Sequence, residues 1–269
     1  MRTPPIVPTA RIAPLGPLAA LAVALCALLA APAAAVAVTL GPTGPAAAPP
    51  VALRATPGAV PADLLVSSSG FSAVSAFDAA TGAPLGGFVA PGAGGLDSTD
   101  GMAWGPDGNL YVCSEKSSQV MRYDGSTGAF LDVFVAAGSG GLNVAENLVF
   151  GADGNLYVAS IGSSQVLRYD GRTGAFLDVF VAAGAGGLNG PTGLLFGPDG
   201  DLYVASTRSS QVLRYDGNTG AFLGALVAAG SGGLSTPVGI AFAADGSFLA
   251  SSLGTGEVLR YDGNTGAFL

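Results

Sequence analysis

Residues 191–206 read P-T-G-L-L-F-G-P-D-G-D-L-Y-V-A-S, and residues 209–223 follow with S-S-Q-V-L-R-Y-D-G-N-T-G-A-F-L. Short runs of β-forming residues alternate here with turns that contain Gly, Asp and Asn, and Asp-Gly supplies the positive φ that tight hairpins require. The stretch therefore predicts four strands, at 193–196, 202–206, 211–216 and 221–227. No run of ten or more positions carries apolar residues at helical spacing, which argues against a helical repeat.

The same unit recurs every 46 residues along the chain. Its clearest marker is an aromatic residue followed by aspartate, found at Phe77-Asp78, Tyr123-Asp124, Tyr169-Asp170, Tyr215-Asp216 and Tyr261-Asp262. A period of about 40–50 residues with several short strands in each period is typical of a β-propeller. We therefore expect an all-β fold, a propeller of four-stranded blades, over residues 63–269.

The number of strands predicts an incomplete ring. The first unit supplies strands at 64–68, 74–78 and 83–89, but its first-strand position, 55–59, contains Pro57 and Gly58. The last unit stops at Leu269, three residues into its fourth strand. We expect about 4.5 blades of a six-bladed ring, truncated at the C-terminal side. An open ring exposes strand edges, which predicts self-association.

The repeated unit resembles the NHL repeat. The resemblance rests on Pro-x-Gly-apolar at 191–194, Asp-Gly-x-Leu-Tyr-Val-Ala at 199–205 and apolar-x-x-Tyr at 212–215, and it covers residues 63–269. It implies a propeller, usually six-bladed, in the wider group that includes gluconolactonase/regucalcin-like (SMP-30) enzymes and streptogramin lyases. The unit departs from the usual repeat at Ser206, where an aspartate is common, and at Ser210-Gln211, where Asn-Arg is frequent.

The N-terminal residues predict export. Residues 1–35 combine two arginines, an apolar run and a small-x-small cleavage site, so we expect a signal peptide cut between Ala35 and Val36. Residues 36–62 are rich in Pro, Ala and Gly and read as a linker. The protein is then secreted, extracellular or periplasmic, with no membrane span after cleavage. Cys113 becomes its single cysteine and occupies a strand position that is otherwise Ser or Ala.

Composition excludes several classes of protein. With 49% hydrophobic and 10% charged residues, the chain is not a disordered protein. A net charge of −8 argues against a general nucleic-acid surface. No histidine is present, which excludes every mechanism that needs imidazole as base, relay or metal ligand.

Residues shared by all blades are expected to be structural. Arg122 and its equivalents precede an aspartate by two residues and predict a repeated Arg–Asp pair that braces a turn. Asp107 and its equivalents are expected to form turns, and Tyr111, Tyr157 and Tyr203 to fill the space between blades.

A site is expected where the blades differ. Asp100, Glu146, Thr192 and Val238 share one position before the first strand of their blades, and Asn147 replaces a glycine. The innermost strand lines the channel of a propeller, so these residues are expected at its mouth. Two carboxylates and an amide are ligands suited to Ca²⁺ or Mg²⁺. The alternative is a solvated acidic loop. The turns after the second strands, such as 114–116, form a second variable rim.

Three functions remain open. The first is a secreted or surface-exposed scaffold that binds a protein or carbohydrate ligand. Near-identical blades favour it, because they indicate that the repeated structure itself serves the function. The second, implied by the resemblance, is a divalent-cation-dependent lactonase or lyase in which Glu146, Asp100 and Asn147 hold the cation, with no histidine base. The third is a fragment of a larger protein without activity of its own. Whether the chain is an enzyme is left open, and no cofactor other than the cation is expected.

Overall fold

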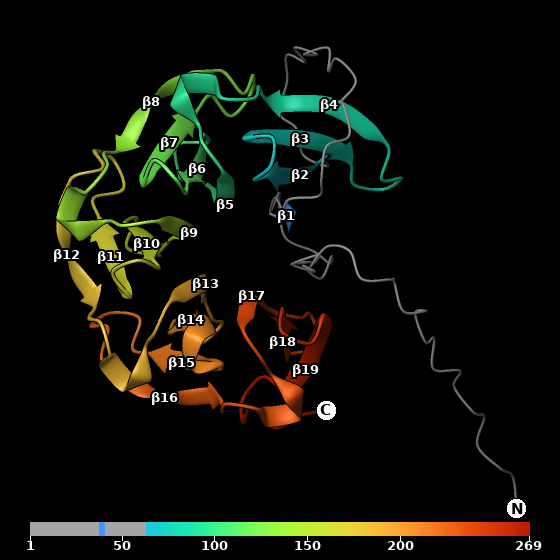
Figure 1. The fold of residues 1–269 in the computed structure, drawn as a ribbon, viewed down its shortest axis with the longest axis vertical. Helices are drawn as coiled ribbons and strands as arrows, with labels where there is room; N and C mark the ends of the chain where they lie inside the picture. Colours follow the sequence, from blue (N-terminus) through green and yellow to red (C-terminus); the bar gives the residue numbers. More distant parts are fainter. Residues whose placement is uncertain (1–37, 41–62) are drawn as a thin grey trace, which may run out of the picture.

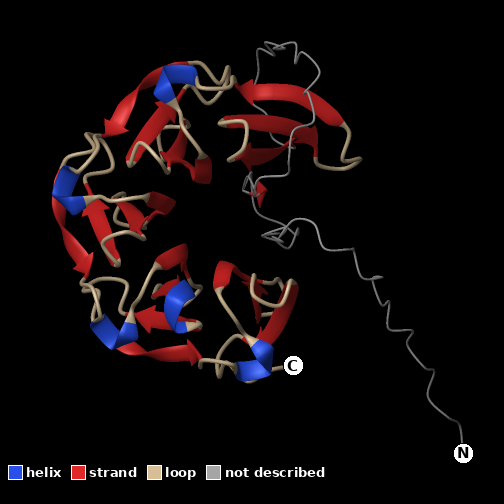
Figure 2. Ribbon diagram, viewed as in Figure 1, coloured by secondary structure: helices blue, strands red, loops and turns tan. Residues whose placement is uncertain are grey.

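The computed structural model describes residues 38–40 and 63–269 as strands, turns and short 3₁₀ segments (Figures 1 and 2). The predicted signal peptide, the cleavage site between Ala35 and Val36, and most of the predicted linker lie outside the described residues. Among the residues that are described, no helix is long and apolar enough to span a membrane.

The predicted all-β propeller is confirmed, with five blades. Blade 1 consists of β1 (Val38–Leu40), β2 (Asp63–Ser68), β3 (Ala73–Asp78) and β4 (Pro84–Val89). Blade 2 consists of β5 (Thr99–Trp104), β6 (Leu110–Ser114), β7 (Gln119–Tyr123) and β8 (Phe130–Val135). Blade 3 consists of β9 (Ala145–Phe150), β10 (Leu156–Ser160), β11 (Gln165–Tyr169) and β12 (Phe176–Val181).

Blade 4 consists of β13 (Pro191–Phe196), β14 (Leu202–Ser206), β15 (Gln211–Tyr215) and β16 (Phe222–Val227). Blade 5 consists of β17 (Pro237–Phe242), β18 (Ser247–Ser252) and β19 (Glu257–Asp262). Short 3₁₀ segments precede the inner strands or follow β14, at η1 (Ala93–Gly95), η2 (Ser139–Gly141), η3 (Ala185–Gly187), η4 (Thr207–Ser209) and η5 (Ser231–Gly233). Consecutive strands of blades 2–5 pair antiparallel.

One strand was not expected. β1 lies within the range predicted to be a linker and pairs with β2 in parallel, with Val38 opposite Val66. Blade 1 therefore has a fourth strand that the repeat pattern did not predict. Its strands β2, β3 and β4 lie where the sequence placed them.

The blades follow one another around an arc that has blade 1 and blade 5 at its two ends (Figure 1). The inner strands β5, β9, β13 and β17 contact one another in that order, and β8, β12 and β16 form the outer perimeter. This arrangement agrees with the predicted open ring. Self-association through the open edges stays a prediction.

Aromatic side chains fill the space between blades, as predicted. The ring of Tyr111 lies 4.8 Å from that of Phe134 in its own blade and 4.9 Å from that of Phe150 in the next blade. Tyr157 makes both equivalent contacts one repeat later. Tyr203 contacts Phe242 of the next blade, whereas in its own blade Leu226 stands at the position of Phe134. Edge-to-face pairs of this kind stabilise beyond the area that they bury. Hydrophobic clusters therefore join each blade to its neighbour.

In blades 2–4 the turn before the fourth strand also joins two blades. The carboxylate of Asp124 accepts hydrogen bonds from the Ser126 and Thr127 backbone N–H groups and the Thr127 hydroxyl, at 3.0, 2.8 and 2.8 Å. The turn ends at Gly128, whose φ is +70°. A Cβ on Gly128 would lie 1.8 Å from the Phe88 carbonyl oxygen of blade 1. Only glycine satisfies both requirements.

Candidate functional site: the variable rim

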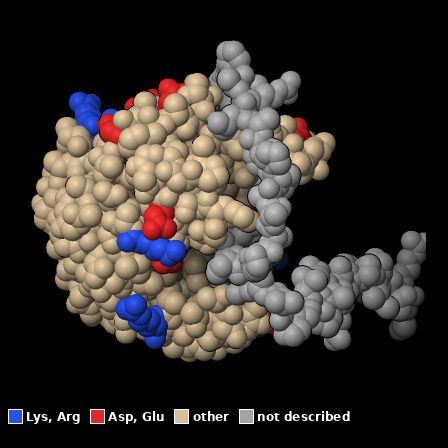
Figure 3. Space-filling model, turned by 45° about the horizontal axis from the view of Figure 1, so that its top comes forward, with Lys and Arg blue, Asp and Glu red and all other residues tan. Residues whose placement is uncertain are grey.

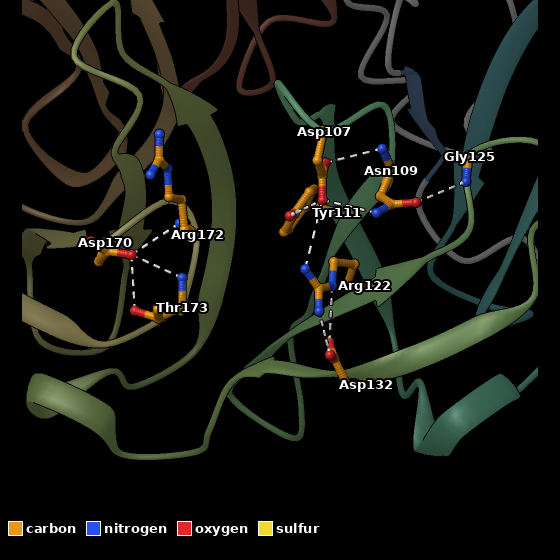
Figure 4. A network of polar contacts seen from close by, with 9 residues as sticks. All are labelled: Asp107, Asn109, Tyr111, Arg122, Gly125, Asp132, Asp170, Arg172 and Thr173. Carbon is orange, nitrogen blue, oxygen red and sulfur yellow. Dashed lines mark hydrogen bonds and ion pairs between the residues drawn. The ribbon is translucent and has the colours of Figure 1, made fainter.

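Figure 4 shows the polar network around Arg122 in blade 2, which recurs around Arg168 in blade 3. In blade 4 Arg214 pairs with Asp199 and Asp201 instead. The guanidinium of Arg122 donates to both carboxylate oxygens of Asp132, at 3.2 and 2.5 Å, and its Nη1 lies 3.6 Å from Asp107. Tyr111 donates its hydroxyl to Asp107 at 3.0 Å. The predicted partner of the arginine, Asp124, is wrong, because its carboxylate is taken up by the adjacent turn. The arginine instead pairs across the sheet, where Arg122 lies opposite Asp132.

The predicted structural roles of Asp107 and Cys113 are confirmed. Asp107 accepts the backbone N–H of Asn109 at 3.1 Å and so closes its turn. Cys113 is fully buried in β6. Burial raises the pKa of its thiol well above the usual value, and the negative charges of Asp100 and Glu146 raise it further. The thiol is therefore a packing group.

Positions that differ between the blades come together at one end of the inner strands. The register pairs the first residue of each inner strand with the last residue of the second strand, as Thr99 with Ser114 and Pro191 with Ser206. Both variable positions of the sequence therefore lie at the same end. Two positions in each of blades 2–5 make up this group: the second position of the inner strand and the residue after the second strand. We call the group the variable rim, and it consists of eight residues: Asp100, Glu115, Glu146, Ile161, Thr192, Thr207, Val238 and Leu253.

The acidic part of the variable rim lies on blades 2 and 3. Asp100 of β5 and Glu146 of β9 share a side-chain hydrogen bond across the blade boundary. Glu115, which follows β6, lies near enough for its charge to act on Glu146, and it accepts a hydrogen bond of 2.6 Å from the Ser98 hydroxyl. Burial, and then the charge of Glu115, raise the pKa of Glu146 to about 7, although the bond with Asp100 opposes this. We interpret this contact between two carboxyl groups as one proton shared by Asp100 and Glu146.

Asn147 makes a different contact from the one predicted for a metal ligand. Its side-chain oxygen accepts the backbone N–H of Leu148 at 2.7 Å. A Cβ on Gly101 would lie 2.6 Å from the Cα of Asn147, so the amide packs closely against the neighbouring blade. Of the three predicted ligands, the structure therefore brings Asp100 and Glu146 together. Residues 38–40 and 63–269 contain no group of three or more His, Cys, Asp or Glu side chains placed to hold a metal ion.

Blade 4 carries two hydroxyl groups where blade 2 carries two carboxyl groups and blade 3 carries Glu146 and Ile161. The hydroxyls of Thr192 and Thr207 lie 2.8 Å apart, and Thr207 donates to the Pro237 carbonyl oxygen at 2.7 Å. On blade 5 the equivalent residues, Val238 and Leu253, are apolar, and Leu253 is 41% exposed. The variable rim thus changes from acidic to hydroxylic to apolar around the ring.

Glu115 is the one acidic member of this group that the sequence did not assign to the site. It was assigned to a separate rim because the turn after β6 was treated apart from the start of β5. The antiparallel register places both at one end, and it could have been read from the repeat. Figure 3 shows that the visible face carries few charged side chains, gathered in small groups on a largely uncharged surface.

No protein-family model matches the chain, and no curated protein matches it in sequence. Solved structures are similar in fold. A streptogramin B lyase is 13% identical with a TM-score of 0.55, covering 74% of this chain and 62% of its own. A virginiamycin B lyase from Staphylococcus aureus is 14% identical with a TM-score of 0.55, covering 76% and 64%.

A protein of unknown function from Bacteroides caccae is 16% identical with a TM-score of 0.56, covering 77% of this chain and 76% of its own. This chain thus spans less than two thirds of the length of either lyase. At these identities the similarity concerns the fold alone. The chain folds as a β-propeller like those of the streptogramin B lyases, consistent with the wider propeller group that the NHL-like repeat indicated.

Proposed function

We propose that this protein is a secreted or surface-exposed β-propeller that binds a protein or carbohydrate ligand at the variable rim. The observation that supports the proposal is that the repeated residues and the variable residues lie in different places and make different contacts. Those shared by the blades are engaged in turns, ion pairs and packing between blades, whereas those that differ gather at one end of the inner strands. Binding residues concentrate on strand ends and loops that a rigid scaffold positions.

The chemistry of the variable rim suits a ligand rich in hydroxyl groups. The carboxyl groups of Asp100, Glu115 and Glu146 accept hydrogen bonds from such a ligand. The hydroxyl of Thr207 can accept one, because its proton is donated to the Pro237 carbonyl oxygen, and Thr192 is buried beneath it. Leu253 adds an exposed apolar surface. Carbohydrates present hydroxyl groups beside apolar ring faces, so they are the ligand class to test first.

The test is binding to an array of defined oligosaccharides. We expect binding that Asp100→Asn and Glu115→Gln each weaken by about tenfold, since a hydrogen bond to a charged group is worth about 1.5–3 kcal/mol. Glu257→Gln is the matched control, because Glu257 is exposed at the start of β19, at the same end of its blade but on blade 5, not on blades 2 and 3 that carry the acidic part of the variable rim. Binding that survives both rim substitutions would place the ligand elsewhere.

A second candidate is a divalent-cation-dependent lactonase or lyase, favoured by the contact between Asp100 and Glu146. Carboxylate oxygens are the ligands that Ca²⁺ and Mg²⁺ prefer, and the pair supplies two of them from adjacent blades. A cation would have to displace the shared proton, so its binding would strengthen as the pH rises. Glu115 is the nearest further carboxylate. Asn147 would contribute only after releasing the N–H of Leu148.

This second candidate has its own test. Millimolar Ca²⁺ should raise the melting temperature of the wild-type chain at pH 8 and leave that of Glu146→Gln unchanged, with Glu257→Gln responding like the wild type. Lactone hydrolysis should then depend on added Ca²⁺ or Mn²⁺ and stop when the metal is removed. A wild-type chain whose melting temperature ignores the cation rules out a cation at Asp100 and Glu146.

A further inference from the structure

Arg208 lies beside the variable rim and forms no ion pair within residues 63–269. It follows Thr207, and its exposed side chain crosses from blade 4 to blade 3, where Nη1 donates to the Ile161 carbonyl oxygen at 3.3 Å. A Cβ on Gly190 would lie 3.1–3.3 Å from three atoms of the arginine side chain, so its stem packs against the backbone there. These two contacts position the guanidinium at the boundary of blades 3 and 4.

Blade 2 shows how a cation at the same position is neutralised within the chain. Lys116 is the equivalent of Arg208, and its Nζ lies 3.8 Å from the carboxylate of Asp97. In blade 4 the position of Asp97 holds Asn189, whose carbonyl oxygen accepts the backbone N–H of Arg208 at 3.1 Å, as that of Asp97 accepts the N–H of Lys116. The backbone is therefore the same, but asparagine carries no charge. Arg208 thus lacks the carboxylate that Lys116 has.

Two asparagine amides lie around the guanidinium of Arg208. Asn189 is exposed directly before Gly190, on which the arginine stem packs. The amide of Asn143 lies over the residue after Ile161, where a Cβ on Gly162 would be 2.6 Å from its Cγ. Within the described part of the chain, neither amide side chain makes a hydrogen bond. The guanidinium has five N–H groups, so this boundary presents several donors and a positive charge.

We propose that Arg208, with the amides of Asn143 and Asn189, binds the carboxylate of a uronic acid in an oligosaccharide held at the variable rim. This inference rests on the proposed function and narrows its carbohydrate ligand to an acidic one. A guanidinium directs two parallel N–H groups at the two oxygens of a carboxylate, which gives the contact specificity as well as affinity.

The charges of the variable rim also orient such a ligand. Its carboxylate is attracted to the boundary of blades 3 and 4 and repelled by the carboxyl groups of Asp100 and Glu115 on the other side of the variable rim. The neighbouring sugars then present their hydroxyl groups to those carboxyl groups, which accept hydrogen bonds.

The test uses fluorescein-labelled tetrasaccharides of galacturonic, glucuronic and mannuronic acid, each compared with its neutral methyl ester. Fluorescence anisotropy with the full chain should show saturable binding of at least one acid. Esterification, or Arg208→Gln in the chain, should each weaken binding about fivefold, as expected for a partly exposed ion pair. The two changes together should weaken it no further, because they remove the same interaction. Arg208→Lys should keep only part of the affinity, since an ammonium cannot bind a carboxylate through two parallel N–H groups.

Arg172→Gln is the matched control for these substitutions. Arg172 is exposed in the turn after β11, and the register of β10 with β11 places that turn at the end of blade 3 opposite to the variable rim. Its loss removes the same charge from the chain and should leave the affinity for the acid unchanged.

Asn189→Asp tests the comparison with blade 2 directly, because it gives blade 4 the acid that blade 2 has at Asp97. The new carboxylate should pair with Arg208 and weaken binding of the acid about fivefold. Asn218→Asp adds the same charge in an exposed turn at the other end of blade 4 and should leave binding unchanged.

The outcomes separate this inference from the proposed function. Esters that bind as tightly as the acids, or acid binding that ignores Arg208→Gln, overturn the inference and leave the proposed function standing. So does binding of neutral oligosaccharides with no binding of the three acids, or binding of an acetylated tetra-aspartate peptide with no binding of any sugar. Failure of the neutral oligosaccharides, the acids and the peptide alike overturns both.

Discussion

Glu146→Gln offers a direct test of the acidic part of the variable rim through stability as a function of pH. The pKa of Glu146 is raised from 4.5 to about 7 in the folded chain. Between these two values the unfolded chain releases a proton that the folded chain keeps. The free energy of unfolding therefore falls as the pH rises through this window and levels off above pH 7. One pKa unit corresponds to about 1.4 kcal/mol, so the loss is about 3 kcal/mol.

Glutamine has the same shape and does not titrate. Its amide can donate to Asp100 at every pH, so we expect Glu146→Gln to keep its stability between pH 5 and pH 8. Above pH 7 the variant should exceed the wild type by up to about 3 kcal/mol, shared with Asp100 because the two carboxyl groups titrate as a pair.

Urea unfolding followed by the fluorescence of Trp104, the single tryptophan, measures this difference. Trp104 lies at the boundary of blades 1 and 2, where its ring centroid is 6.1 Å from that of Phe88. The series is run with EDTA at pH 5, 6, 7 and 8, with Glu257→Gln as the control for removing one exposed carboxylate. A wild-type chain that gains stability from pH 5 to pH 7, or a glutamine variant that loses as much as the wild type, would refute the shared proton.

Three further predictions concern the boundaries between blades. Gly128→Ala should lower the free energy of unfolding by about 2 kcal/mol or more beyond Gly82→Ala in urea titrations, because both have φ of +70° but only Gly128 approaches a neighbouring blade. Val144→Gly should raise the melting temperature, since a valine at φ of +59° costs about 1–2 kcal/mol, and an unchanged value would contradict that strain. Tyr169→Phe should cost about 1 kcal/mol in the same titrations, because its hydroxyl donates at 2.8 Å to the Ser139 carbonyl oxygen in the segment that connects blade 2 to blade 3.

The strand pattern could be predicted from the sequence because each blade repeats one local code. Asp-Gly and Asp-x-x-Thr-Gly turns specify hairpins, and alternating apolar residues specify which face of each strand is buried. β14, predicted at 202–206, has those bounds in the structure. The repeat pattern does not predict β1, because this parallel strand lies outside the repeat and no hairpin turn connects it to β2.

The partners of charged side chains could not be predicted in the same way. Spacing along one strand suggested Arg122 with Asp124, but neighbours on the same strand face compete with residues across the sheet. The aspartate is held by three short hydrogen bonds in its own turn, which lower its pKa, with the Thr127 hydroxyl as the largest cause. The arginine is then left to Asp132, which the register places directly opposite. The hydrogen bonds of the turn occupy the carboxylate of Asp124, so the ion pair forms with the cross-strand residue Asp132.

The same reasoning explains why repetition points to the variable rim. Blades 2–4 share the same turn before the fourth strand and the same tyrosine at the blade boundary, so those positions have little freedom to acquire a function. The start of an inner strand contacts the next blade through backbone and small residues, as Gly101 does with Asn147. Its adjacent side chains can therefore change without breaking the ring. Asp100 and Glu146 occupy two such positions on neighbouring blades, so their meeting depends on the ring's geometry and disappears in an isolated blade.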